Sequence, residues 1–201
     1  MALIRDSKGR RDNETPSGYE RLFGNRELGM LISKVQSAVI STGNELEKTL
    51  ANKIKNTKGI SIYNINKKDR IFKKAKGNHD INIDCVVNKE GNVYLIEIKD
   101  GDTFDTKKVA GELESLRLAK SFLMKKKISA KNILIKFCSF NATSHEQIER
   151  GAKGLLEEGM AMTGKELCAL LDINFEQIVE ERISQQKENL NYFFEELEKI
   201  S

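Results

Sequence analysis

The chain of 201 residues is long enough to bury one core, and its composition, 39% hydrophobic and 32% charged with a mean hydropathy of −0.49, excludes a disordered or membrane protein. Its apolar runs fall short of the roughly 18 residues of a spanning helix, and its start, MALIRDSKGRR, lacks the apolar core of a secretory signal, so we expect a cytoplasmic protein. Three cysteines without C-x-x-C spacing and two histidines exclude a disulfide framework, a zinc site and a histidine-rich metal site, which leaves carboxylates and lysine for any chemistry.

Basic residues are concentrated in the first part of the chain. Residues 1–80 hold 17 Lys and Arg against 9 acids, residues 81–143 hold 11 against 8, and residues 144–201 hold 6 against 13. The stretch from Lys53 to Lys76 contains nine basic residues and one acid. Such a run can contact phosphates, because binding to a polyanion releases counterions, or it can be a solvated surface. Charge alone leaves both interpretations open.

The first element expected along the chain is an irregular arm over residues 1–24, which are polar, lack periodicity and contain the only proline. Apolar residues at helical spacing then predict an amphipathic helix over residues 28–39. Residues 41–43 interrupt this pattern with Ser, Thr and Gly, so we expect a second helix to start at Asn44.

Three stretches of alternating apolar residues predict strands over residues 60–65, 81–87 and 93–99. A polar turn over residues 88–92 separates the last two, which are expected to form a β-hairpin. A long amphipathic helix over residues 109–123, with Asp102 or Thr103 as its capping residue, comes next, and a further strand over residues 132–140 follows. The order is therefore helix, strand, strand, strand, helix, strand.

Residues 144–201 are predicted to be helical. Three helix starts are marked by a capping residue followed three positions later by Glu or Gln, namely Ser144 and Gln147, Thr163 and Glu166, and Asn174 and Gln177. We expect these helices to form an appendage packed on an α/β core within residues 26–140, so that residues 1–201 make up a single domain.

Glu97 and Lys99 form the only E-x-K pattern of the chain, at the end of the strand predicted over residues 93–99. Side chains alternate along a strand, so both residues point to the same face. One interpretation is an ordinary charge cluster on the wet face of a surface hairpin. Helices predicted before and after the strands favour a cluster buried at the margin of the sheet.

The hairpin register selects a partner for Glu97. If residues 90–91 are the centre of the turn, Asp84 lies across from Glu97, whereas Asp80 faces a position beyond the end of the strand. Two carboxylates held this close repel each other unless a cation lies between them. A hard divalent ion with oxygen ligands fits this requirement, and magnesium is the usual choice for phosphate chemistry.

In this element order, residues 44–140 resemble the PD-(D/E)XK nuclease superfamily. That superfamily has an α-β-β-β-α-β core, with an Asp on the second strand and a (D/E)-x-K motif on the third. Asp84, twelve intervening residues, Glu97 and Lys99 match this pattern in type, order and strand position. The departure is Ile83, which stands where the motif has proline. The resemblance implies a restriction-endonuclease-like α/β fold with a mixed sheet flanked by helices and a C-terminal helical appendage.

The resemblance also implies catalytic roles. Asp84, Glu97 and the carbonyl of Ile98 would hold Mg²⁺ next to the scissile phosphate, and Lys99 would position or help deprotonate the attacking water. Hydrolysis would leave a 5′-phosphate and a 3′-hydroxyl.

Glu47 is a candidate fourth catalytic residue. Residues 43–47 resemble the G-x-x-x-E pattern that many superfamily members carry on the first core helix, and Glu47 lies on the apolar stripe beside Leu50, an unusual place for an acid. The alternative is a capping box made by Asn44 and Glu47, which needs no catalysis.

Five lysines are candidate DNA contacts: Lys107 and Lys108 at the start of a helix, and Lys73, Lys74 and Lys76 in the basic run. For the helical pair, a solvated helix face is the alternative. Residues 163–187 superficially resemble a helix-turn-helix, but three basic residues against five acids favour packing or dimerisation.

Small size, a compact core and a basic flank suit a type II restriction endonuclease that acts as a homodimer on a short palindrome of double-stranded DNA, without an organic cofactor. One alternative is a repair or junction-resolving nuclease that recognises DNA shape. Another is a nucleic-acid-binding protein on the same scaffold without cutting activity, in which Asp84, Glu97 and Lys99 could be replaced without loss of function. Base contacts come from loops and inserted helices, so no motif predicts a recognition sequence.

Overall fold

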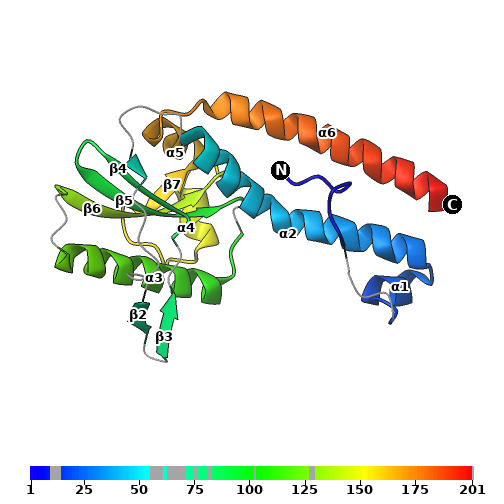
Figure 1. Ribbon diagram of the computed structural model, residues 1–201, viewed down its shortest axis with the longest axis horizontal. Coiled ribbons are helices and arrows are strands. Elements are labelled where there is room, and N and C mark those ends of the chain that lie inside the picture. Colours follow the sequence, from blue (N-terminus) through cyan, green and yellow to red (C-terminus); the bar gives the residue numbers. More distant parts are fainter. Residues whose placement is uncertain are drawn as a thin grey trace. The chain divides into compact units, whose positions relative to one another are not determined.

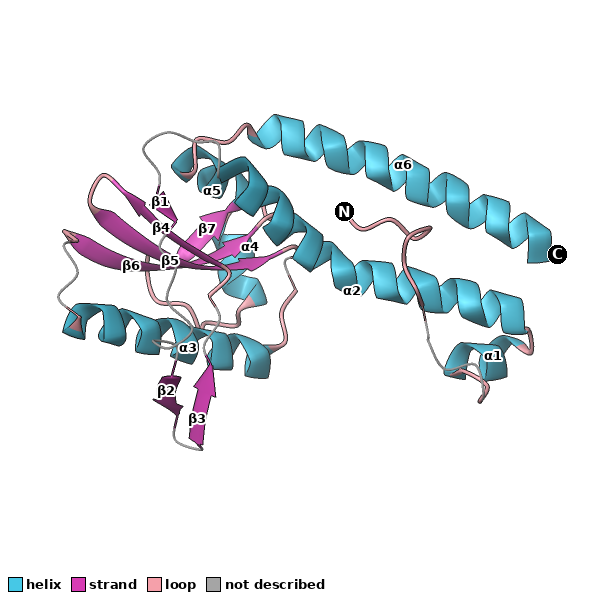
Figure 2. Ribbon diagram, viewed as in Figure 1, coloured by secondary structure: helices cyan, strands magenta, loops and turns pink. Residues whose placement is uncertain are grey.

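The structure, a computed structural model, describes residues 1–9, 15–54, 61–62, 71–74, 77–80, 83–101, 103–126 and 130–200, with the backbone alone for the three ranges between 61 and 80. The chain divides into two compact units, Met1–Lys48 with Glu176–Ser201, and Thr49–Phe175. Their helices and strands are labelled in Figure 1, apart from β1, which Figure 2 labels. No helix within the described ranges is long and apolar enough to cross a membrane.

The first unit is helical and contains α1 (Gly18–Phe23), most of α2 (Arg26–Ile54) and most of α6 (Phe175–Ile200). The prediction of an irregular arm is wrong for α1. The Ser17 hydroxyl accepts a hydrogen bond from the Glu20 N–H at the start of this helix, and Gly24 ends the helix in the left-handed conformation with φ 63°. Local capping therefore makes a short helix in a segment without hydrophobic periodicity.

Residues 1–9 lack helix and strand, as predicted, but their backbone is held in place. Ala2 and Ile4 are buried. The side-chain amide of Asn189 on α6 accepts from the Ile4 N–H at 2.7 Å and donates to the Ala2 carbonyl at 2.9 Å. These paired hydrogen bonds satisfy backbone groups that would otherwise be buried without partners.

Helix α2 is continuous from residue 26 to 54, so the predicted break at residues 41–43 is wrong. Thr42 is buried, and its hydroxyl donates to the Ala38 carbonyl one turn earlier at 2.9 Å. Gly43 costs a helix about 1 kcal/mol. Burial of a leucine such as Leu46, 2% exposed, contributes roughly 1.5–3 kcal/mol, so packing outweighs the local break. Asn44 lies inside the helix and is not a capping residue, which removes the capping-box explanation for Glu47.

The second unit is built around a mixed sheet. Its five described strands lie in the order β1-β4-β5-β6-β7, with bounds β1 Ser61–Ile62, β4 Cys85–Lys89, β5 Asn92–Lys99, β6 Asn132–Ser139 and β7 Ala161–Thr163. β1, β4 and β5 pair antiparallel, whereas β5, β6 and β7 pair parallel. The predicted α-β-β-β-α-β order in a mixed sheet is confirmed. A separate hairpin, β2 (Ile71–Lys74) and β3 (Gly77–Asp80), is inserted between β1 and β4.

Helices cover both faces of this sheet (Figure 2). α3 (Thr106–Lys125) and α4 (His145–Gly151) contribute to a core on one face with Val86, Leu95 and Phe137. α5 (Gly164–Leu170) lies on the opposite face, where Leu167 and Cys168 are buried. The strand face that bears Glu97 is therefore covered by α3 and is not a wet surface.

Capping signals predict several helix starts correctly. Ser144 caps α4, Thr163 and Glu166 make a full capping box at α5, and α6 begins directly after Asn174. The cap of α3 is Asp105, which accepts from the N–H groups of residues 107 and 108, so the prediction of Asp102 or Thr103 is wrong. β7 was also missed, because three residues carry no periodicity and this strand depends on its pairing with β6.

Candidate active site

The candidate active site lies on the hairpin formed by β4 and β5. Cys85 pairs with Ile96, as predicted, and the pairing continues to the end of both strands. The two turn residues, Glu90 and Gly91, have φ angles of 54° and 83°, the positive values of a type I′ turn, which matches the right-handed twist of paired strands. The turn therefore sets the register that the sequence predicted.

β4 starts later than predicted, at Cys85 and not at residue 81. Asp84 is the residue immediately before the first pair, which places it next to Glu97 on the neighbouring strand. Asp80 belongs to β3, a different sheet. The choice of Asp84 over Asp80 as the partner of the E-x-K strand is confirmed, although the predicted strand was too long.

A backbone hydrogen bond fixes the Asp84 carboxylate against β5. Its Oδ2 accepts a hydrogen bond from the Ile98 N–H at 2.8 Å. Ile98 is the residue between Glu97 and Lys99, so this bond joins Asp84 to the E-x-K segment. Burial raises the pKa of Asp84, while the Ile98 N–H and the charge of Lys99 offset part of that rise. The carboxylate is thus held in a position where its negative charge is poorly solvated.

Glu97 is the most buried acid of the cluster, with its side chain 8% exposed. Burial, together with the negative charge of Asp84, raises the pKa of Glu97 to about 8. The contact with Lys99 offsets part of this rise but does not cancel it. Asp84, just before β4, and Glu97 on β5 are therefore close enough for their negative charges to repel each other, as the predicted register requires.

Lys99 places its ammonium between two carboxylates. Its Nζ lies 2.6 Å from Oε1 of Glu97 and 2.7 Å from Oε1 of Glu112 on α3. Burial alone would lower the pKa of Lys99, but the hydrogen bonds to Glu112 and Glu97 outweigh it and raise that pKa. Lys99 is therefore charged and acts as a donor of hydrogen bonds.

Glu112 is a member of this cluster that the sequence analysis missed. Its side chain is 17% exposed, and within the described part of the chain its Oε2 is buried without a hydrogen-bond partner. A sequence signal existed, because Glu112 falls on the apolar stripe of its helix beside Val109, Leu113 and Leu116. An acid at such a position is the same anomaly that drew attention to Glu47.

The donor set fits a divalent cation. Three acids, Asp84, Glu97 and Glu112, surround one ammonium, so the cluster carries excess negative charge in a half-buried place. Oε2 of Glu112 has no partner and the pKa of Glu97 is raised, because the one ammonium of the cluster does not balance its three carboxylates. Among the described residues, no group of three acid, His or Cys side chains is arranged to hold a metal ion. Glu97 forms an ion pair with Lys99 in this structure.

A pocket of about 190 Å³ opens beside the cluster. Its lining includes Lys99, Glu112, Phe104 and Lys108. Lys108, predicted to contact DNA, therefore shares a pocket with two members of the cluster. Lys107 is exposed and does not line this pocket.

Three of the other predicted site residues belong to elements other than the β4–β5 hairpin and α3. Lys73 and Lys74 lie on β2, where the backbone alone is described, and Lys76 lies outside the described residues. Glu47 belongs to the first unit, on α2, and is half-buried there. Its catalytic role stays a prediction.

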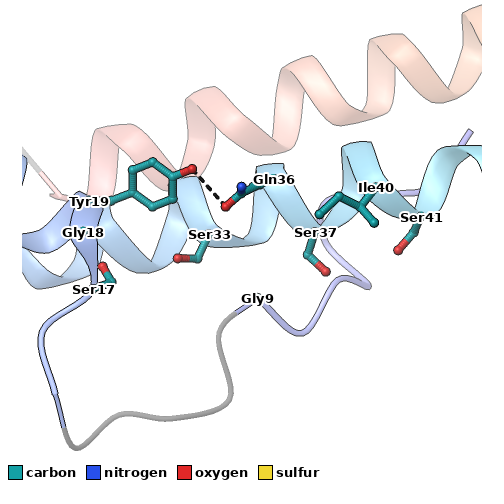
Figure 3. Close-up of a pocket in the computed structure, with 9 residues that line it drawn as sticks. All are labelled: Gly9, Ser17, Gly18, Tyr19, Ser33, Gln36, Ser37, Ile40 and Ser41. Carbon is teal, nitrogen blue, oxygen red and sulfur yellow. Dashed lines mark hydrogen bonds between the residues drawn. The ribbon is translucent and has the colours of Figure 1, made fainter. Parts of the chain in front are cut away.

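The first unit has a pocket of its own on α2, of about 470 Å³ (Figure 3). The hydroxyls of Ser33, Ser37 and Ser41 line it, and Tyr19 donates to Gln36 at 2.9 Å. None of the described lining residues is an acid, a lysine, an arginine or a histidine. This pocket lacks the groups for hydrolysis that the hairpin cluster has.

A mixed sheet whose central hairpin gathers an Asp, a Glu and a Lys of the D…E-x-K pattern is the core of the PD-(D/E)XK nucleases, which confirms the resemblance. The chain is similar along its whole length to the type II restriction enzyme HhaII of Haemophilus parahaemolyticus, with 35% identity over 220 aligned positions that cover 100% of this chain and 95% of that enzyme. No family model matches the chain, and no solved structure matches it. The chain belongs to the type II restriction endonucleases.

Proposed function

We propose that this restriction endonuclease hydrolyses double-stranded DNA at a short specific sequence, depends on Mg²⁺, and uses the cluster on the β4–β5 hairpin. The observation that carries the proposal is the convergence of Asp84, Glu97 and Lys99 on one side of a register-matched hairpin. Full-length similarity to a type II restriction enzyme supports DNA as the substrate.

Asp84, Glu97 and the carbonyl of Ile98 are the proposed ligands of the ion. When bound, Mg²⁺ would supply positive charge to the scissile phosphate and to the leaving oxygen. The Ile98 N–H holds the Asp84 carboxylate against β5, beside the other two proposed ligands. Glu97 must exchange its contact with Lys99 for the ion, which would relieve its repulsion with Asp84.

Lys99 has a raised pKa and is therefore an ammonium near neutral pH. An ammonium donates hydrogen bonds and cannot accept a proton, so we assign it to orienting the attacking water and the phosphate oxygens rather than to deprotonating water. In-line attack by that water would leave a 5′-phosphate and a 3′-hydroxyl. Lys108, across the 190 Å³ pocket, is placed to bind a neighbouring phosphate.

Further contacts along the DNA are assigned to the other four candidate lysines, Lys107, Lys73, Lys74 and Lys76. We propose that the enzyme works as a homodimer, because two-fold symmetry in the protein matches the two-fold symmetry of a palindromic site and presents one active site to each strand. We propose the cytoplasm as its location, because that is where its DNA substrate is found.

The decisive experiment incubates the protein with plasmid and phage DNA in Mg²⁺, beside Asp84→Asn and Lys99→Ala variants. We expect discrete fragments with 5′-phosphate ends from the wild type and none from either variant. The matched controls, Glu158→Gln and Lys165→Ala, change an exposed acid and an exposed lysine of the same unit and should cut normally. Normal cutting by Lys99→Ala would overturn the assigned site, and cutting confined to branched or damaged DNA would overturn the proposed sequence specificity.

Two further assignments are tested in the same preparations. Glu47→Gln should reduce cleavage if Glu47 is the fourth catalytic residue, and unchanged cleavage would remove it from the site. Light scattering on a size-exclusion column should give twice the 22.8 kDa mass of one chain, whereas a monomer that cuts both strands at once would contradict the dimer.

A further inference from the structure

The Lys99 ammonium has two ion-pair partners in the described part of the chain, and they come from different layers of the fold. Glu97 is two residues away on the same strand. Glu112 reaches the ammonium from α3, the helix that covers this face of the sheet. If Glu97 turns to a bound cation, as proposed above, the contact with Glu112 remains.

We propose that Glu112 is a positioning residue for Lys99, one that holds its ammonium toward the substrate pocket while Glu97 serves the cation. The inference rests on the proposed role of Lys99. Glu112 and Lys99 line the same 190 Å³ pocket, so their contact lies at the place where the phosphate is expected.

The position of Glu112 is set by the core and not by local flexibility. Its neighbours on the helix, Val109, Leu113 and Leu116, are at most 2% exposed, and they pack with Leu95 of β5. A buried stripe on both sides of Glu112 fixes where its carboxylate meets the sheet. A lysine side chain has many rotamers, so a fixed partner reduces the number of places that the Lys99 ammonium can occupy.

Charge also separates the roles of the two partners. Glu97 lies beside Asp84, and a cation that binds between them would relieve the repulsion between the two carboxylates. The negative charge of Glu112 also raises the pKa of Asp84 and the pKa of Glu97, but less than burial does, and Glu112 uses one oxygen, Oε1, for Lys99 at 2.7 Å. Glu112 can therefore keep the ammonium after Glu97 has turned away.

The competing explanation is that the Glu112–Lys99 pair only ties α3 to the sheet. A structural tie would change stability, and it would change cleavage only through the folded fraction. A positioning contact would lower the rate of the chemical step in fully folded protein, with DNA affinity unchanged. It would also act only through Lys99, so that its loss has no further effect once Lys99 is absent.

The test measures single-turnover cleavage of a plasmid that the wild type cuts, in Mg²⁺, for Glu112→Gln, Lys99→Ala and the double variant. We expect Glu112→Gln to slow cleavage by about 10- to 100-fold, the range found when a partner that orients an active-site group is lost. DNA affinity, measured in EDTA by electrophoretic mobility shift, should stay within about threefold of the wild type, and the double variant should be as slow as Lys99→Ala. The control is Glu114→Gln, an exposed acid on the same helix.

Each outcome of this test either supports or overturns the positioning role of Glu112. A Glu112→Gln rate equal to that of Glu114→Gln overturns the inference, and the loss of cleavage in Lys99→Ala would still uphold the proposed function. Normal cleavage by Lys99→Ala overturns both. A double variant much slower than Lys99→Ala shows that Glu112 acts independently of Lys99 and also overturns the inference. If Glu112→Gln lowers the Tm so far that the folded fraction is in question, Glu112→Asp keeps the charge but withdraws it by one methylene, and must show the same rate loss at an unchanged Tm.

Discussion

Replacement of Glu97 by glutamine should stabilise the metal-free protein while it abolishes cleavage. Burial and the charge of Asp84 raise the pKa of Glu97 from its ordinary 4.5 to about 8. Between these values, the folded protein holds a proton on Glu97 that the unfolded chain has released. Glutamine is neutral at every pH and can still accept from Lys99, so it avoids this proton uptake.

The magnitude follows from the shift. A pH of 7 is about 2.5 units above the unfolded pKa of 4.5, and at roughly 1.4 kcal/mol per unit the wild type is destabilised by at most about 3 to 4 kcal/mol. We expect Glu97→Gln to raise the free energy of unfolding by roughly 1–3 kcal/mol at pH 7. The sign with pH is opposite to that of an ordinary salt-bridged acid, because the advantage of glutamine is absent below pH 4.5, grows as the pH rises and levels off above pH 8.

Urea unfolding in EDTA between pH 5 and pH 8 measures the difference between the two proteins, with Glu158→Gln as the control for loss of an exposed acid. Addition of Mg²⁺ should stabilise the wild type and narrow the gap, because a ligand that binds only the folded state adds stability. A Glu97→Gln protein that is less stable than the wild type at pH 8 in EDTA would refute the reasoning, since Glu97 would then be a carboxylate with net favourable contacts.

Three further outcomes are expected. Removal of divalent ions with EDTA should stop cleavage, and excess Mg²⁺ should restore it within the same preparation; cleavage that persists in EDTA would exclude a metal-dependent site. Gly164→Ala should lower the free energy of unfolding by about 1–3 kcal/mol, because its Cβ would clash with the Phe140 carbonyl oxygen, whereas Gly111→Ala, with open space on α3, should raise it by about 1 kcal/mol; urea denaturation compares the two. Lys108→Ala should weaken DNA binding equally for all sequences and reduce the salt-dependence slope by about 0.9, whereas Lys125→Ala at the far end of α3 should leave both unchanged.

The sequence by itself determined the chemistry of the hairpin, because each step of that inference is local. A two-residue turn sets the register of the strands that it joins, and strict alternation then decides which side chains share a face. Residues 90–91 and the apolar pattern were enough to place Asp84, Glu97 and Lys99 together. The order of helices and strands was equally local, since it depends on periodicity within each segment.

The tertiary structure alone decided what depends on contacts between distant segments. The continuity of α2 through Gly43 follows from the burial of its stripe, which outweighs the weak helix propensity of that residue. β7 exists because β6 offers it a partner. Glu112 joins the cluster because α3 packs on the face of β5 that bears Lys99, a meeting of residues 13 positions apart that no local spacing encodes. The sequence could mark Glu112 as an acid on an apolar stripe, but only the packing of the helix on the sheet shows that its partner is the motif lysine.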